Sequence, residues 1–320
     1  MQLGLATLIL SAVSHPDLFQ PALSALWSSL YQSAFYRAST FETFLTVLSY
    51  GLIEPRYTRK FAHSPSLRID LRERGTSRSA SSEGANNATT KGNSPQLPKM
   101  KRPSKRLGEI FTYIAPLLLL DLTLIKKFSG VPVEDIRTAG GYSAVPSKNI
   151  DASFLFVTVH NFSWASPVQL VRALPHEPPT SRRLVIEVIS SFFIYDTLFF
   201  LAHVGFHRIS ALQPYHLPHH THQEIHPQVT NKLSITERLS LVLLANFSLN
   251  VIGSHVLSRT IFVPVFVWLL VEAHCGMDLP LGYEKILPKG WGSGAKEHSR
   301  HHRTGRGSYA PFFTWWDMGL

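Results

Sequence analysis

Histidines are concentrated in two short parts of this chain, and their spacing constrains its fold more than any other feature. Eleven of the sixteen histidines lie within residues 203–226 and 274–302. His203 and His207 stand four residues apart, and the pattern HxxHH occurs at 216–220 and again at 298–302. Spacings of three and four residues place side chains on one face of a helix. Each cluster therefore predicts a helix that presents several imidazoles in one direction.

The three clusters and the isolated His274 form a set of candidate metal ligands, which we expect to converge. They are His203, His207, His216, His219, His220, His274, His298, His301 and His302. Nine imidazoles exceed the three or four protein ligands of one zinc ion, so the set predicts two metal ions. Imidazole binds Zn, Fe, Cu and Ni, so the residue type alone does not select the metal. His222 and His226 form HQEIH, which lacks the zinc-protease Glu after the first His, and we interpret them as loop histidines or outer partners of the ligands.

Carboxylates are scarce in these clusters, and this bears on the choice of metal. A hydrolytic site with two zinc ions would usually contain bridging carboxylates, and the HxxHH clusters include only Glu297. A neutral, all-histidine set favours two iron ions that activate O2, with a dizinc site as the alternative. Asp196 lies two helical turns before His203, where it is expected to accept the outer N–H of a ligating imidazole or, alternatively, to cap a helix. Asp278 and Asp317 are weaker candidates for this outer shell, with surface carboxylates as the alternative.

Apolar segments recur often enough to indicate a membrane protein. Hydrophobic residues make up 44% of the sequence and charged residues 16%, against roughly 25% in soluble domains. The single cysteine, Cys275, excludes an intramolecular disulfide and a cysteine-based metal cluster. Segments that could enter a bilayer are 3–13, 41–53, 110–125, 184–202, 239–257 and 261–273. Several are shorter than the ~20 apolar residues of a straight span, which predicts paired or re-entrant segments.

A strongly basic segment sets the expected orientation. Residues 56–107 contain thirteen Lys or Arg and three Asp or Glu, a balance equal to the whole formal net charge of +10. Residues 75–106 have almost no large apolar side chain, so they are predicted to be a disordered, cytosolic linker. This segment lacks interleaved aromatic residues, so no nucleic-acid partner is expected. If this linker is cytosolic, crossings by 110–125 and 184–202 return the chain to the cytosol at His203. Crossings by 239–257 and 261–273 return it there again at His274. The expected fold is all-α: a polytopic membrane protein with a cytosol-facing cap that carries a histidine-rich dimetal site.

The motifs taken together resemble a known superfamily. HxxxH, two HxxHH motifs, His274 before a Gly-x-Asp-x-Pro turn and a C-terminal Trp-Asp are similar to the fatty acid hydroxylase/sterol desaturase superfamily of membrane di-iron enzymes. Within it, VEAHCGMDLP, ILPKGWG, EHSRHH and YAPFFTWWD are most similar to the cholesterol 25-hydroxylase group. The resemblance covers residues 184–318 well and 110–183 loosely.

The resemblance implies a function, a location and a set of partners. It implies a multi-pass enzyme of the endoplasmic-reticulum membrane whose metal site faces the cytosol. Two iron ions on the nine histidines would use O2 to hydroxylate an unactivated C–H bond of a lipid, either a sterol or a fatty-acyl chain. Electrons would come from NAD(P)H through a reductase or cytochrome b5. The division into domains follows: N-terminal membrane-associated helices (1–55), the basic linker (56–107) and the histidine-box di-iron hydroxylase domain (108–320).

Several alternatives stay open. Sterol desaturases and C4-methyl sterol oxidases share these histidines, so they remain candidates on the same scaffold. Glu297 stands where the group often has a further His, and the sequence reads DMGL where the group continues into a short helix. A non-catalytic relative is therefore also open, as is a dizinc hydrolase that needs no O2. A membrane transporter is disfavoured, because its pathway would carry carboxylates inside the membrane whereas these histidines cluster at span ends.

Overall fold

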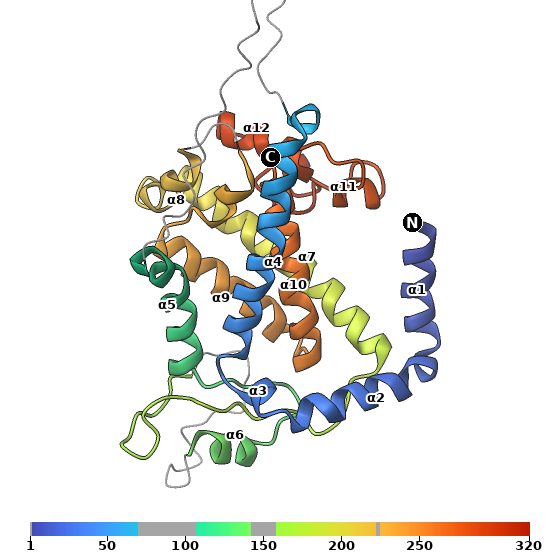
Figure 1. The fold of residues 1–320 in the computed structure, drawn as a ribbon, viewed down its shortest axis with the longest axis vertical. Coiled ribbons are helices and arrows are strands. Elements are labelled where there is room, and N and C mark those ends of the chain that lie inside the picture. Colours follow the sequence, from blue (N-terminus) through green and yellow to red (C-terminus); the bar gives the residue numbers. More distant parts are fainter. Residues whose placement is uncertain (1, 70–106, 142–157, 222–224) are drawn as a thin grey trace, which may run out of the picture.

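Helices form the regular structure of the chain. The computed structural model describes residues 2–69, 107–141, 158–221 and 225–320, and within these ranges the chain forms helices and no strand (Figure 1). The predicted all-α class is confirmed. The predicted linker core, 75–106, and His222 lie outside the described residues. The α-helices are α1 (Gln2–Ser14), α2 (Pro16–Gln32), α3 (Ala34–Arg37), α4 (Phe41–His63), α5 (Leu107–Thr123), α6 (Val133–Gly140), α7 (Ser181–Arg208), α8 (Gln213–His220), α9 (Ile235–Val251), α10 (Val256–Ala273), α11 (Tyr283–Ile286) and α12 (Gly294–Thr304), and the 3-10 helices are η1 (Pro65–Leu67), η3 (Pro227–Asn231) and η4 (Asp317–Gly319).

Four long helices, α4, α7, α9 and α10, form the centre of the molecule. Helix α4 lies along α10, and α7 packs on both α9 and α10 (Figure 1). Helix α5 contacts α4 and α9, whereas α1 and α2 contact α7 on the other side. The largest aromatic cluster joins α7, α9, α10 and the C-terminal loop, and its buried members are Phe192, Tyr195, Leu249, Phe262 and Phe312. The C-terminal loop is therefore fixed to the bundle through Phe312.

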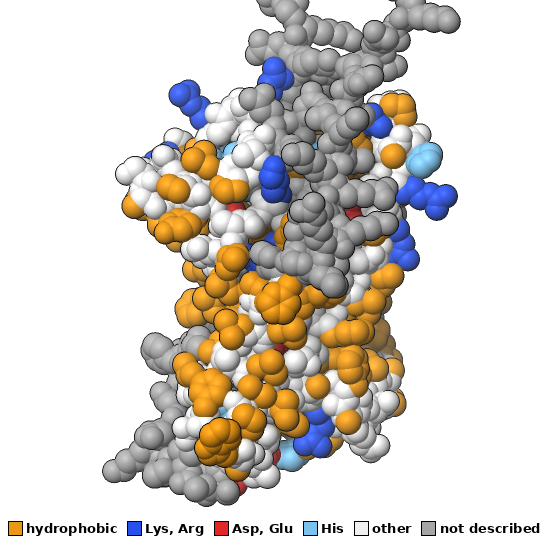
Figure 2. Space-filling model, turned by 60° about the vertical axis from the view of Figure 1, so that its left-hand side comes forward, with side chains coloured by type: hydrophobic (Ala, Val, Ile, Leu, Met, Phe, Trp, Pro, Cys, Tyr) orange, Lys and Arg blue, Asp and Glu red, His pale blue; other side chains and the backbone are white. Residues whose placement is uncertain are grey.

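Two of these helices are long and apolar enough to cross a membrane. Helix α7 has 28 residues and α10 has 18. At 1.5 Å per residue they measure about 42 and about 27 Å, against ~30 Å for the hydrocarbon core of a bilayer. Apolar side chains cover much of the middle of the visible face in Figure 2. Exposed examples from four helices are Leu48, Leu52, Phe111, Leu119, Leu201, Leu243 and Phe247.

The predicted membrane segments need correction at their bounds. The segment predicted at 239–257 contains a turn, because α9 ends at Val251 and α10 begins at Val256. The segments predicted at 3–13 and 110–125 contain apolar helices shorter than 18 residues, Leu3–Ser14 and Tyr113–Thr123. Among the described residues, only α7 and α10 therefore have the length and composition of a span.

One end of the bundle carries the histidine-rich segments. Helices α8, α11 and α12 gather there with the C-terminal ends of α7 and α10, at the top of Figure 1, and we call this end the cap. Residues 56–69, which the sequence analysis assigned to the linker, lie in this folded part of the described chain. Helix α4 continues to His63, and the N–H of Ile69 donates to the carbonyl of Gly276 at 3.0 Å. Gly276 has a positive φ of 65°, and a Cβ there would lie 2.2 Å from the carbonyl oxygen of Ile225.

A buried arginine fastens the segment before α7 to the end of the bundle opposite the cap. The Arg172 side chain is 1% exposed, and its Nη1 lies 3.0 Å from Oε1 of Glu42. Its Nε and Nη2 both donate to the carbonyl of Tyr36, at 3.1 and 2.7 Å. The guanidinium also lies over the rings of Tyr36 and Phe41, 4.9 and 5.0 Å from their centroids. This contact joins the segment before α7 to α3 and the start of α4, which lie 130 to 136 residues earlier in the chain.

Replacement of Arg172 should therefore destabilise the protein. We expect Arg172→Met to lower the free energy of unfolding by about 3–5 kcal/mol, because Glu42 and the Tyr36 carbonyl lose a buried partner. Unfolding in detergent would be followed by tryptophan fluorescence, with Arg59→Met on the exposed surface of α4 as the matched control. The control should change the free energy by less than about 0.5 kcal/mol. Equal effects of the two substitutions would contradict this account of the contact.

Candidate metal centre

One group of imidazoles, which we call site 1, lies where α7, α8 and α12 meet. Each residue offers one ring nitrogen, and these nitrogens lie within 4.8 Å of one another. Nε2 of His203 is 3.0 Å from Nε2 of His216 and 3.1 Å from Nε2 of His301. Nε2 of His207 is buried and has no hydrogen-bond partner. The members of site 1 are His203, His207, His216, His220 and His301.

A second group, site 2, lies beside the first and combines α8, α12 and the end of α10. Its four residues are all buried, and their ring nitrogens also lie within 4.8 Å of one another. Nε2 of His274 is 3.2 Å from Nε2 of His219 and 2.9 Å from Nε2 of His298. Nε2 of His302 is 3.2 Å from that of His298. The rings of His220 in site 1 and His302 in site 2 stack at 4.6 Å, so the two sites are adjacent.

The two groups together contain all nine predicted ligands. The expected convergence of the three clusters and His274 is thus present in the structure, whereas metal binding by them stays a prediction. Each HxxHH helix serves both sites. On α8, His216 and His220 belong to site 1 and His219 to site 2; on α12, His298 and His302 belong to site 2 and His301 to site 1. Helix α8 continues through Pro218, so the proline does not prevent this arrangement.

The hydrogen bonds of the outer nitrogens show which ring nitrogens carry protons. Nδ1 of His203 lies 2.7 Å from the carbonyl of Tyr309, and Nδ1 of His301 lies 2.6 Å from the carbonyl of Gly307. A carbonyl only accepts, so both Nδ1 atoms carry a hydrogen, and the Nε2 of each neutral ring is a bare lone pair. Two lone pairs that face each other at 3.1 Å cannot bond to each other. A cation between them would turn this repulsion into attraction.

The same arrangement recurs in site 2. Nδ1 of His274 donates to the carbonyl of Leu270 at 2.7 Å, and Nδ1 of His219 donates to that of Lys232 at 3.3 Å. Their Nε2 atoms again face each other, at 3.2 Å. With metal–nitrogen bonds of about 2.0–2.1 Å, neighbouring ligands lie about 2.9 Å apart at a right angle and about 3.4 Å apart at the tetrahedral angle. The observed distances lie within this range, so the residues fit a metal ion at each site.

Burial keeps the imidazoles neutral. Burial, helped by repulsion between neighbouring rings, lowers the pKa of His216 to about 2 and that of His301 to about 3. Burial also lowers the pKa of His274 to about 4. All three pKa values lie below the ordinary 6.5, so these rings are neutral at neutral pH. Each then carries one hydrogen on its outer nitrogen, and its inner nitrogen is free to bind a metal. Neutral imidazole is the form that ligates metals.

A glutamate that the sequence analysis missed holds one of the ligands. Oε1 of Glu237 lies 2.7 Å from Nδ1 of His216, and Glu237 is 2% exposed. Burial raises the pKa of Glu237 to about 8 in the absence of a cation, and a metal ion on the far nitrogen of His216 would favour the carboxylate. A buried carboxylate that accepts the outer N–H of a ligating histidine is a common outer partner in metal sites.

The three aspartates predicted for this outer shell do not contact the imidazoles. Oδ1 of Asp196 accepts the backbone N–H groups of Phe312 and Phe313 instead, and its Oδ2 has no hydrogen-bond partner. Asp317 accepts the N–H groups of Tyr309 and Ala310. Both aspartates therefore fix the C-terminal loop, whose Tyr309 carbonyl in turn binds His203. Asp278 is exposed and pairs with Lys285, away from both sites.

Other residues lie near the centre without joining it. His226 is buried beside Phe61 and belongs to neither group. Phe206 stacks on the ring of His216, and Phe199 packs against His203, so these aromatics cover the ligands. Neither site includes a carboxylate among its described ligands.

Comparison with known proteins agrees with these motifs. Residues 188–320, which include all nine histidines, match the model of the fatty acid hydroxylase family. This part of the chain is similar to that family. The fatty acid hydroxylases are iron-dependent membrane proteins, and the matched residues contain both histidine groups.

Curated relatives match slightly less than half of the chain. Over 148 residues the chain is 32% identical to cholesterol 25-hydroxylase of Rattus norvegicus and 31% identical to that of Homo sapiens, over 46% of this chain and 50% and 54% of those proteins. A Dictyostelium discoideum protein, provisionally named a methylsterol monooxygenase, is 31% identical over 153 residues, or 43% of this chain and 51% of that protein. The chain thus spans about half the length of these relatives. No solved structure matches it.

The contact of Glu237 with His216 predicts a role in metal retention by the histidine groups. We expect Glu237→Gln to weaken iron binding by about 10- to 100-fold, because the amide is a poorer acceptor for the outer N–H of His216. Iron retained against a chelator would be measured by mass spectrometry of the metal content. Glu297→Gln is the matched control, since Glu297 pairs with Arg300 on the outer face of α12. Equal retention in both variants would show that Glu237 does not support the ligand.

The lowered histidine pKa values predict how the metal-free protein responds to acid. The pKa of His274 is 6.5 when unfolded and about 4 when folded, so the unfolded chain binds more protons between these values. Stability of the metal-free protein should therefore be greatest above about pH 6.5 and fall steadily toward about pH 4. Thermal unfolding across this range would measure the slope, which His274→Gln should reduce. A pH-independent unfolding temperature would be inconsistent with buried, neutral ligands.

Proposed function

We propose that the chain is a membrane oxygenase that hydroxylates an unactivated C–H bond of a sterol or fatty-acyl lipid. It would use O2 and externally supplied electrons at a centre of two iron ions. The observation that carries this proposal is the pair of adjacent histidine groups with opposed Nε2 atoms. The match to the fatty acid hydroxylase family and the similarity to cholesterol 25-hydroxylases support the reaction class.

The residues of the two sites would supply neutral, preoriented ligands. Site 1 would hold one ion through up to five imidazoles, and site 2 the other through four. Bound iron would supply the redox chemistry that activates O2 for attack on a C–H bond. The chain itself fixes each ring through its outer N–H, keeps the inner nitrogen unprotonated and covers the centre with aromatic rings. Iron is favoured over zinc because neither site contains the carboxylate that would bridge a hydrolytic zinc pair.

A large cavity next to the centre would hold the lipid. It measures about 680 Å³ and lies between α4, α5, α9 and α10. Most of its lining is apolar, and its volume is within the roughly 300–1,000 Å³ of typical small-molecule sites. Leu270, whose carbonyl holds His274, lines the cavity, as does Arg238, the neighbour of Glu237. One end of the cavity is therefore adjacent to the metal centre.

The location and the electron donor follow from the same proposal. Two helices long enough to cross a membrane support a membrane location. We propose the endoplasmic reticulum, with the metal centre facing the cytosol, where a reductase or cytochrome b5 would deliver electrons from NAD(P)H. The basic segment 99–106 supports a cytosolic location for this side of the protein.

A second candidate reaction uses the same centre. The similarity to a protein provisionally named a methylsterol monooxygenase favours oxidation of a sterol C4-methyl group, and desaturation would need the same oxidant. A non-catalytic relative would retain the ligands without turnover. The identity of the product, determined by lipid mass spectrometry, separates these three cases.

Ligand substitutions test the proposed centre. We expect His301→Ala in site 1 and His219→Ala in site 2 each to abolish hydroxylated product, with a loss beyond the about 10- to 100-fold typical of outer partners. Membrane insertion should be unchanged in both. His176→Ala is the control, because His176 is exposed and contacts Asp135 and Tyr31, outside both sites.

The assay would follow O2 uptake and lipid products in membranes that contain iron-loaded protein and a reductant. Activity that persists without O2 would favour a hydrolase. Turnover that is unchanged in both ligand variants would disprove the assignment of the centre. Absence of any product from the wild-type protein, with both irons bound, would favour the non-catalytic alternative.

A further inference from the structure

We infer that the large cavity contains a polar subsite, at its end remote from the metals, that binds the oxygen-bearing head of the lipid. The carbon presented to the metals then lies far from that head. This inference rests on the proposed function, because it assigns the orientation of the lipid in the same cavity.

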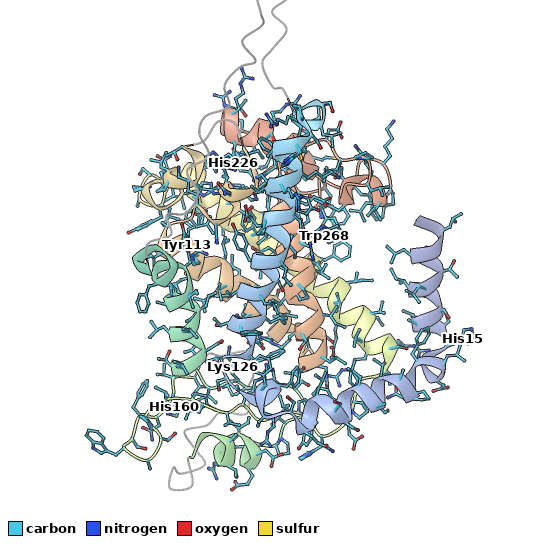
Figure 3. The ribbon with its side chains drawn as sticks, viewed as in Figure 1. His15, Tyr113, Lys126, His160, His226 and Trp268 are labelled. Atoms are coloured by element: carbon cyan, nitrogen blue, oxygen red, sulfur yellow. The ribbon has the colours of Figure 1, made fainter. Side chains whose placement is uncertain are left out.

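The subsite consists of charged and amide side chains at one end of a mostly apolar cavity, whose other end carries Arg238 and Asn231. Nζ of Lys126 lies 2.6 Å from Oδ1 of Asp121, and Arg259 donates from Nη1 to Oδ1 of Asn250 at 2.8 Å and from Nη2 to Oδ1 of Asn246 at 2.5 Å. All five side chains line the cavity. Asp121 and Arg259 are each only 4% exposed. Figure 3 shows Lys126 toward the end of the bundle away from the cap, whereas Tyr113, which lines the same cavity, lies nearer the cap.

The charges of this subsite indicate which head groups it accepts. Glu42 lies 3.6 Å from Lys126, 3.0 Å from Arg172 and 3.5 Å from Arg259. With Asp121, the network contains two carboxylates and three cations, an excess of one positive charge. Buried charges in membrane helices are costly and usually serve function. An oxygen atom that accepts hydrogen bonds, as in a hydroxyl or a carboxylate, would use this excess, whereas a quaternary ammonium head would be repelled.

Two helices fix the distance between the subsite and the metals. Helix α10 lines the cavity with a single stripe formed by Arg259, Phe262, Val263, Phe266, Val267 and Leu270. From Arg259 to Leu270 the helix rises about 16 Å, and from Arg238 to Asn250 helix α9 rises about 18 Å. Leu270 and Arg238 mark the end beside the metals. Both helices therefore place the head-group subsite more than a dozen ångströms from the centre.

This separation selects the position of the reacting carbon. A lipid whose head occupies the subsite presents its distal, apolar end to the metals. The C4-methyl group of a sterol adjoins the C3 oxygen, so it would lie at the wrong end of the cavity. The geometry therefore favours hydroxylation of a remote carbon, such as one on a sterol side chain or far along an acyl chain.

The first experiment uses wild-type, iron-loaded protein with O2 and a reductant. Cholesterol and palmitic acid are supplied separately, beside the headless analogues cholest-5-ene and hexadecane. The new hydroxyl is located by mass-spectrometric fragmentation. We expect a single position remote from the head for cholesterol or palmitic acid, and at least about tenfold weaker apparent affinity for the analogue, because it loses a hydrogen bond to a charged group.

The second experiment tests the subsite by substitution. We expect Lys126→Met to raise KM for the oxygen-bearing lipid by about tenfold while leaving KM for its headless analogue unchanged, and Lys126→Arg to restore the wild-type value. Lys285→Met is the matched control, since Lys285 also pairs with an aspartate, Asp278, but outside the cavity. The analogue comparison needs only wild-type protein, so it decides the question even if Lys126→Met fails to fold.

The outcomes separate this inference from the proposed function. No hydroxylated product from any of the four lipids would overturn the proposed function itself. Product hydroxylated next to the head, or equal affinity for the lipid and its headless analogue, would leave the oxygenase intact and overturn the subsite. An equal rise in KM for both lipids in Lys126→Met would likewise show that Lys126 does not bind the head group.

Discussion

The cap depends on an interaction that is unfavourable without a cation. Unprotonated nitrogens face one another at about 3 Å in both groups, and their outer N–H groups are already used by carbonyls. The rings cannot turn to relieve the repulsion without breaking these outer hydrogen bonds. Metal ions would convert the repulsion into coordination bonds, and that binding energy would stabilise the folded cap. Metal binding would therefore be coupled to the folding of α8 and α12.

The HxxHH motif explains why the two sites lie side by side. Residues four apart on α8 or α12 point into one site, and the residue three positions after the first reaches the other. Each short helix thus contributes to both sites, so an ion in one site would affect the ligands of the other. Two separate motifs with only i and i+4 histidines would allow the sites to drift apart. The closeness of the two histidine groups follows from the spacing of the histidines.

The helical spacing made the convergence of the histidines predictable, but not the residues that hold them. Eight of the nine could be grouped because helix periodicity places i, i+3 and i+4 on one face, whereas His274 stands alone in the sequence. Asp196 was assigned to His203 from the same periodicity, yet its partners are backbone N–H groups more than a hundred residues away, which no local pattern reveals. Glu237 follows Ser234 in the Ser-x-x-Glu pattern of a helix cap, and Ser234 does accept its N–H. That pattern gives no sign that the side chain turns to His216.

The membrane segments were predicted with similar limits. Apolar composition identified α7 and α10, because both are long and uninterrupted. It did not locate the turn between α9 and α10, since residues 252–255 include apolar and small residues that resemble the helices around them. The basic charge of residues 56–69 led to their assignment to the linker. In the structure α4 carries basic residues to its end, and the N–H of Ile69 donates to the carbonyl of Gly276. Charge alone does not distinguish the polar end of a helix from a linker.

Helices α9 and α10 each run from one end of the cavity to the other. Helix α9 carries Glu237 beside site 1 and Asn250 in the remote subsite, and α10 carries Arg259 in that subsite and ends at His274 of site 2. A residue inserted between these positions would rotate one end by about 100° relative to the other as well as lengthen the helix. The distance between the proposed subsite and the histidine groups can therefore change only by whole helical turns. The proposed enzyme would select its carbon by length, and the apolar walls between the two ends could vary without changing the position of the reaction.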